Sequence, residues 1–169
     1  MKKLKNILAI FMTLTALNSY AQSQELMAEF SLFFEYHKNN DFTSALPHGW
    51  NVIHENPEPF IRYKIFTRME EALFFMHDSI ATTDEEKLQI ADTTLFLYEK
   101  AIQFEADKKA YFLARKAFVI ENWTNRPVED AISAYEEALI ADPNLDTFYQ
   151  DRLGVLYARE STDENGYKL

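Results

Sequence analysis

An all-α fold is predicted by the spacing of the apolar residues and by the positions of glycine and proline. Apolar residues recur at intervals of three and four along most of the chain, which is the period of a helix with one buried face. No segment shows the strict alternation of apolar and polar residues that a half-buried strand requires. The chain has only three glycines and five prolines, and the prolines lie near expected helix boundaries.

About seven helices are expected, joined by short turns into antiparallel hairpins. They span residues 26–37, 44–55, 60–78, 84–105, 108–123, 128–141 and 146–159. Ser44 is the expected N-cap of the second helix, which puts Pro47 in the first turn, where its missing N–H has no partner to lose. Thr83 and Glu86 have the spacing of a capping box and mark the start of the fourth helix.

Residues 1–21 have the layout of a secretory signal peptide. A cationic start precedes an apolar run over residues 7–17, and Ser19 and Ala21 place small residues before a cleavage site at Gln22. The apolar run is too short to cross about 30 Å of hydrocarbon at 1.5 Å per residue. We therefore expect export to the periplasm of a diderm bacterium, or secretion, with no membrane span after cleavage.

Charge and composition exclude several classes of function. Lys and Arg number 17 against 27 Asp and Glu, for a formal charge of −10, and without the lysines of residues 1–21 the charge is −13. Such a polyanion repels phosphate backbones, so no nucleic-acid partner is expected. The absence of cysteine excludes thiol nucleophiles, disulfides and cysteine-ligated metals. Three glycines cannot build a glycine-rich phosphate loop.

The sequence predicts no catalytic or metal site, no cofactor and therefore no enzyme. Four histidines are present, none with the spacing of a metal-ligand pair: His37, His48, His54 and His77. Adjacent carboxylates, such as Glu70 and Glu71 or Glu136 and Glu137, point about 100° apart on a helix and do not converge. We interpret them as solvated helix faces.

An internal repeat is the most informative feature of the chain. Ala45 is followed twelve residues later by Pro57, and Ala131 is followed twelve residues later by Pro143. In both places the alanine opens the second helix of a hairpin and the proline closes it. Small residues let two helices approach closely, and aromatic residues fill the gaps between hairpins. The residues predicted to pack in this way are Tyr36, Ala45, Pro57, Ala131, Tyr135, Ala138, Pro143, Leu153, Gly154 and Tyr157.

At these residues the chain resembles the tetratricopeptide repeat (TPR) family, whose helix pairs stack into a right-handed superhelix. The resemblance implies an α-solenoid over residues 22–162, with a frayed tail at 163–169. Its repeat-like units are residues 26–59, 108–144 and a half unit at 145–160, and the hairpin at 60–106 is longer and lacks a clear signature. Gly49 stands where the family usually has an aromatic residue. The alternative is an ordinary helical bundle.

The final half unit predicts that something packs against the C-terminal end of the repeat. Leu153, Gly154 and Tyr157 open a helix pair whose second helix is missing from the predicted elements. We expect that a longer array follows or that a partner covers this end.

The resemblance also implies a binding groove, because the first helix of each TPR unit lines the concave face. For the first unit it places five residues there: Met27, Phe30, Phe34, His37 and Lys38. Phe30 and Phe34 could equally be core residues packed on the next hairpin. Lys116 and Arg159 are the groove candidates of the later units. Phenylalanines stand where family members that grip a terminal carboxylate have lysine and asparagine, so that activity is not implied.

The function expected from these features is a non-enzymatic protein–protein interaction scaffold of the cell envelope. Its partner would be a protein or peptide, basic or apolar in character, because the chain is acidic and binding hot spots tend to be aromatic. The alternative is an envelope protein that binds a small ligand or a glycan on exposed aromatic side chains, for which Trp50 and Trp123 are the candidates.

Overall fold

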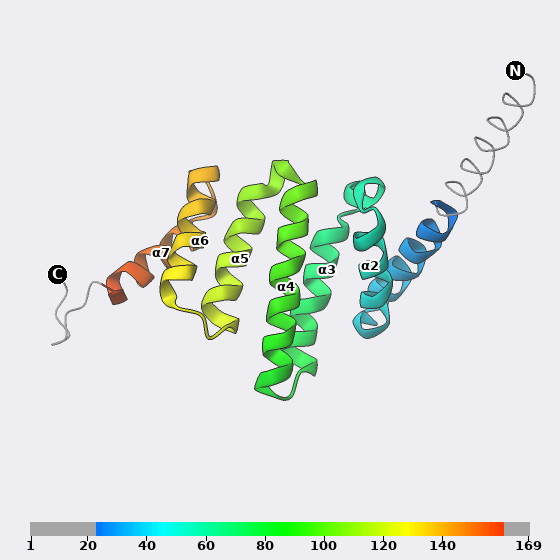
Figure 1. Ribbon diagram of the computed structural model, residues 1–169, viewed down its shortest axis with the longest axis horizontal. Helices are drawn as coiled ribbons and strands as arrows, with labels where there is room; N and C mark the ends of the chain where they lie inside the picture. Colours follow the sequence, from blue (N-terminus) through cyan, green and yellow to red (C-terminus); the bar gives the residue numbers. More distant parts are fainter. Residues whose placement is uncertain (1–22, 161–169) are drawn as a thin grey trace, which may run out of the picture. The chain divides into compact units, whose positions relative to one another are not determined.

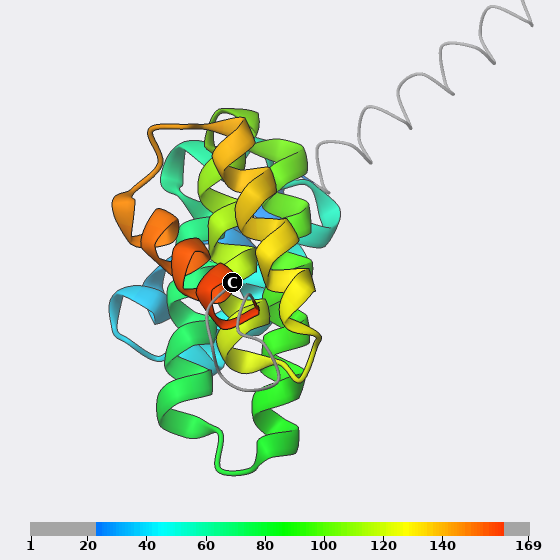
Figure 2. The same cartoon turned by 90° about the vertical axis from the view of Figure 1, so that its left-hand side faces the viewer.

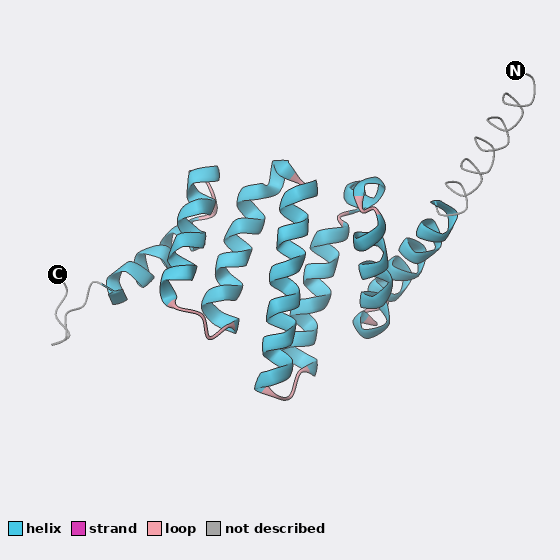
Figure 3. Cartoon of the chain, viewed as in Figure 1, coloured by secondary structure: helices cyan, strands magenta, loops and turns pink. Residues whose placement is uncertain are grey.

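The computed structural model describes residues 23–160, and this part of the chain is helical with no strand (Figures 1 and 3), which confirms the all-α prediction. Residues 23–38 form the first helix described. It is followed by α2 (Phe42–Glu55), η1 (Glu58–Tyr63), α3 (Ile65–Phe75), η2 (Met76–Ile80), α4 (Asp84–Phe104), η3 (Ala106–Lys108), α5 (Lys109–Trp123), α6 (Val128–Ala141) and α7 (Thr147–Glu160). The predicted signal peptide and the tail at 163–169 lie outside the described residues.

The chain divides into two compact units between residues 60 and 61. Unit 1 contains the described residues 23–60 and unit 2 contains 61–160. In unit 2 each helix packs chiefly against the next one along the chain, from α3 on α4 through to α6 on α7 (Figures 1 and 2). Packing between sequence neighbours is typical of helical repeat proteins. None of the helices between residues 23 and 160 has an apolar stretch long enough to cross a membrane.

Unit 1 is a helical hairpin whose buried residues are largely aromatic or small. Phe33, Ala45 and Val52 are fully buried between residues 23–38 and α2. The N-cap of α2 is Asp41, whose carboxylate accepts from the backbone N–H of Ser44 at 3.2 Å. The prediction of Ser44 as N-cap is therefore wrong, because the carboxylate one turn earlier starts the helix sooner. Pro47 consequently lies inside α2 and not in its first turn.

The predicted continuous helix over residues 60–78 is interrupted in the structure. A 3₁₀ turn, η1, ends at Tyr63, and Lys64 has a φ of 60° in the left-handed region before α3 begins. The Arg68 side chain donates from Nε to the Tyr63 carbonyl oxygen at 3.1 Å and so satisfies an acceptor at the break. The helical path then runs two residues past the predicted end, through the π-helical turn η2 to Ile80.

The capping box predicted before the fourth helix is confirmed. Thr83 accepts from the Glu86 backbone N–H at 3.2 Å, and the Glu86 carboxylate accepts from the Thr83 backbone N–H at 3.1 Å. These bonds satisfy N–H groups that the first turn of a helix leaves without intrahelical partners. From this start, α4 runs 21 residues and contributes Leu97, Tyr98 and Ala101 to the core of unit 2.

Candidate functional site

The predicted groove residues of unit 1 separate into buried and exposed sets. Met27 is 52% exposed, Lys38 is exposed and Phe34 is half-buried. Phe30 is only 8% exposed, with its ring stacked 4.4 Å from that of Phe60, and His37 is 5% exposed. Of the two readings left open for Phe30, the structure supports core, and the assignment of Phe30 and His37 to an open groove is corrected.

Two cavities that share Leu26 and Glu55 nevertheless open in unit 1. One has a volume of about 350 Å³ and is lined by Glu25, Leu26, Glu29, Asn51, His54 and Glu55. The other measures about 290 Å³ and is lined by Ser23, Leu26, Met27, Glu55, Asn56, Pro59 and Phe60. Hydrogen bonds from Asn51 and His48 lower the pKa of Glu29 below its ordinary value and keep that carboxylate charged. The lining of the first cavity is therefore acidic.

The predicted packing residues also differ in burial. Ala45, Ala131, Tyr135 and Ala138 are buried at helix contacts, Pro57 is buried, and Tyr36 is half-buried with its ring stacked on His48. Pro143 is exposed just beyond α6, and Leu153 is half-buried. Gly154 has open space around it, and Tyr157 is 45% exposed with its hydroxyl donating to Glu136. The expectation that Gly154 and Tyr157 pack between hairpins is corrected, because no helix within residues 23–160 covers them.

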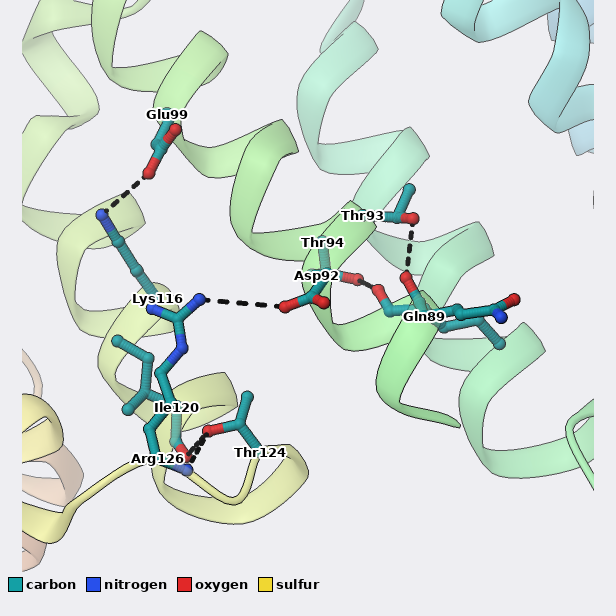
Figure 4. A network of polar contacts seen from close by, with 10 residues as sticks. Gln89, Asp92, Thr93, Thr94, Glu99, Lys116, Ile120, Thr124 and Arg126 are labelled. Atoms are coloured by element: carbon teal, nitrogen blue, oxygen red, sulfur yellow. Dashed lines mark hydrogen bonds and ion pairs between the residues drawn. The ribbon is translucent and has the colours of Figure 1, made fainter. Parts of the chain in front are cut away.

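The remaining candidates are two cations predicted to line the groove and two tryptophans predicted to bind a ligand. Lys116 faces α4, where its Nζ is 3.3 Å from Glu99 Oε1 (Figure 4), so its assignment to the groove is corrected. Arg159 is exposed near the end of α7. The Trp123 ring is stacked on His77 with centroids 3.7 Å apart, so one of its faces is already occupied. Trp50 is half-buried, with its ring stacked on His54 at 5.6 Å.

A buried carboxylate joins three helices of unit 2 in what we call the Glu70 cluster. Glu70 of α3 is 4% exposed and accepts from the hydroxyls of Tyr98 on α4 at 2.6 Å and Tyr111 on α5 at 2.8 Å. It also accepts from Nε of Arg115 on α5 at 2.5 Å. Burial opposes the charge on Arg115, but the Glu70 carboxylate outweighs it and raises the Arg115 pKa. The Arg115 guanidinium therefore stays charged inside the protein.

A second buried carboxylate forms the Glu121 cluster with the same chemistry. Glu121 of α5 has a side chain only 6% exposed, and it accepts from the hydroxyl of Tyr135 on α6 at 2.9 Å. Both Nε and Nη2 of Arg152 on α7 donate to its two oxygens, with Nε at 3.2 Å. This bidentate bond raises the pKa of Arg152.

The two clusters are repeats of one arrangement. In each, the carboxylate lies on the first helix of a hairpin, the tyrosine on the second helix, and the arginine on the helix after that. The tyrosine precedes the arginine by 17 residues in both, from Tyr98 to Arg115 and from Tyr135 to Arg152. The ring contacts repeat as well. The ring centroids of Tyr98 and Phe112 are 6.1 Å apart, and those of Tyr135 and Tyr149 are 6.2 Å apart. The internal repeat therefore includes the hairpin that lacked a signature in the sequence.

Unit 2 also carries a set of phenylalanines from alternate helices, which we call the aromatic row: Phe74 of α3, Phe118 of α5 and Phe148 of α7. The ring centroids of neighbours are 6.3 Å and 6.2 Å apart. Phe148 is 46% exposed, and the other two are half-buried. The Arg115 guanidinium lies 4.4 Å from the Phe74 ring and 5.5 Å from the Phe118 ring. Arg115 thus connects the Glu70 cluster to the aromatic row.

The tyrosines of the two clusters predict a loss of stability at alkaline pH. Burial and then the Glu70 charge raise the pKa of Tyr98, and burial and then the bond to Glu121 raise that of Tyr135. Both groups ionise near pH 10 in the unfolded chain but higher in the folded one. Their contribution is complete below pH 10 and is lost as the pH rises above it, by up to about 1.4 kcal/mol per pH unit for each tyrosine.

Urea unfolding followed by circular dichroism between about pH 8 and about pH 11 checks this prediction. The double variant Tyr98→Phe/Tyr135→Phe should lose less stability over that range than the wild type. Parallel loss in both proteins would contradict the assignment.

Sequence reasoning missed both clusters and the aromatic row. The prediction of a solvated face holds for the exposed Glu71 but is wrong for Glu70, which is 4% exposed. The signal that could have found the two clusters is the repeated 17-residue separation of tyrosine and arginine. Thr94 and Ala106 stand where the recognised copies have alanine and proline, and these two substitutions concealed the third copy.

Comparisons with known proteins found no similar protein. No family model matches the chain, and no match was found among the curated proteins or the solved structures. Within residues 23–160, no group of three or more histidines and carboxylates is arranged to hold a metal ion. The functional argument therefore rests on the surface and packing of the chain itself.

Proposed function

We propose that the chain is a non-enzymatic scaffold that holds a segment of a partner protein against the aromatic row. The observation that carries this proposal is the row itself: three phenylalanines from three helices, partly accessible and joined by ring contacts. Aromatic side chains dominate the binding energy of protein interfaces because they bury a large area with few rotatable bonds. The TPR resemblance supports the same surface, since α3, α5 and α7 are the first helices of their hairpins.

Charges beside the aromatic row favour a basic partner. Glu71 lies three residues before Phe74, and Asp151 lies three residues after Phe148, so each carboxylate shares a helix face with its phenylalanine. Both are exposed. Two cations beside the row are paired with carboxylates, Arg115 with Glu70 and Arg152 with Glu121. Acidic groups around apolar rings attract a segment that combines apolar residues with lysine or arginine and speed its association at low salt.

The cellular setting belongs to the proposal as well. The signal-peptide layout of residues 1–21 supports a role in the periplasm or outside the cell. The scaffold would then act on another exported protein.

The test is cross-linking capture from an envelope extract, with the exported chain as bait. Phe118→Ala/Phe148→Ala should reduce retention of a specific partner about ten-fold or more, because two aromatic contacts are lost. Phe96→Ala/Phe104→Ala is the matched control, since both rings are on α4 and 40% exposed. Circular dichroism establishes that both variants remain helical. Equal retention by the two variants, or a partner lost only from the control, would refute the proposal.

A further inference from the structure

The hairpin of α3 and α4 is longer than the hairpin of α5 and α6. The carboxylate and the tyrosine are 28 residues apart in the Glu70 cluster but 14 apart in the Glu121 cluster. The difference adds about two turns to each helix at 3.6 residues per turn. Figures 1 and 2 both show the connection between η2 and α4 extending past the connection between α5 and α6. We call residues 76–93 the hairpin tip.

A cavity of about 320 Å³ opens in the hairpin tip. It is lined by Met76, Ile80, Ala81, Glu86, Gln89, Ile90 and Thr93. Ile80 is 47% exposed at this site. Gln89 and Thr93 lie on the side of α4 opposite the ion pairs that connect α4 with α5 and the following loop (Figure 4). The packing of α5 therefore leaves this side of α4 open.

The π-helical turn fixes one wall of the cavity. In η2 the Ala81 backbone N–H donates to the Met76 carbonyl oxygen at 2.8 Å, a bond that spans five residues. Such turns occur frequently at functional sites. His77 is held on Trp123 by ring stacking, with centroids 3.7 Å apart, which anchors the turn to α5. Met76 and Ile80 contribute to the cavity from the same turn.

The charge of the hairpin tip indicates what would bind there. Residues 76–93 contain five carboxylates and one cation, Lys87. The carboxylates are Asp78, Asp84, Glu85, Glu86 and Asp92. Asp92 lies on the opposite side of α4, 3.8 Å from Arg126, so the other four form the acidic surround of the cavity. The Asp78 side chain is 62% exposed, and hydrogen bonds from the backbone and side chain of Thr82 and from Thr83 lower the pKa of Glu86 and keep it charged. A cavity that presents Met76, Ile80 and Ile90, with carboxylates around it, complements an apolar side chain that has cations on both sides.

We propose that the hairpin tip is a second docking site, where one large apolar side chain of a partner peptide enters the cavity and flanking lysines or arginines face the carboxylates. This site shares no residue with the aromatic row, so it stands or falls independently of the function proposed above.

Methyl NMR titration of the exported chain tests the site directly. The probe is the synthetic peptide GSKKLKKSG, with its leucine changed to alanine in one control and its four lysines changed to glutamate in another. The lysine–leucine peptide should shift the methyl signals of Ile80 and Ile90. Each control peptide should bind at least about ten-fold more weakly. Added salt should weaken binding of the lysine–leucine peptide.

Two variants separate the site from general attraction to an acidic protein. Ile80→Ser should abolish the shift at Ile90, whereas Ile140→Ser, at a residue 82% exposed on α6, should leave binding unchanged. Equal binding of the leucine and alanine peptides would overturn the proposal by showing attraction to charge alone. Shifts elsewhere, or none at Ile80 and Ile90, would also overturn it.

Discussion

Glu70→Ala is expected to lower the free energy of unfolding of unit 2 by about 3–5 kcal/mol. The carboxylate is 4% exposed and accepts hydrogen bonds from Tyr98, Tyr111 and Arg115. Its removal leaves a buried guanidinium without its counter-charge and two hydroxyls without their acceptor, and each of these costs free energy in the folded state.

Urea unfolding followed by tryptophan fluorescence measures this effect. A Trp50→Phe background leaves Trp123 of α5 as the reporter of unit 2. Glu71→Ala is the control, because that carboxylate is adjacent in sequence but exposed, and we expect a change within about 0.5 kcal/mol. Similar losses in the two variants would show that the Glu70 cluster does not stabilise unit 2.

Phe112→Ala should destabilise unit 2 by about 3–5 kcal/mol through the cavity that it leaves. The Phe112 ring is fully buried and lies against Tyr98 and Phe66, with centroid distances of 6.1 Å and 6.4 Å. Thermal or urea unfolding in the Trp50→Phe background reports the change. Phe104→Ala is the control, since Phe104 contacts the same Phe66 ring but is 40% exposed. A loss for Phe112→Ala no larger than for Phe104→Ala would contradict the core position of Phe112.

The helical elements could be predicted from the sequence because their signals are local. Apolar spacing identifies the helices, and the side chains of Thr83 and Glu86 define a start within a single turn. The break at Lys64 had no such signal, because neither glycine nor proline stands at the left-handed position. Its conformation depends on packing that a sequence window does not contain.

The candidate site was less predictable because burial is a property of the folded chain. Glu70 and Glu71 are chemically alike and adjacent, yet only Glu70 meets the hydroxyls and guanidinium of two other helices. Phe30 has the spacing of a groove residue and of a core residue alike, and its contact with Phe60 decides between them. The aromatic row joins residues of three helices and has no signature in any one of them.

The position of α5 in both clusters has a consequence for how unit 2 responds to local disturbance. This helix supplies Arg115 to the carboxylate before it and Glu121 to the arginine after it. A stack of repeats held only by contacts between neighbours can lose its terminal helix while the rest stays folded. Here the release of α7 would leave Glu121 on α5 without Arg152. Disruption of α5 would leave Glu70 on α3 without Arg115. These contacts across α3, α5 and α7 thus oppose fraying of the terminal helix.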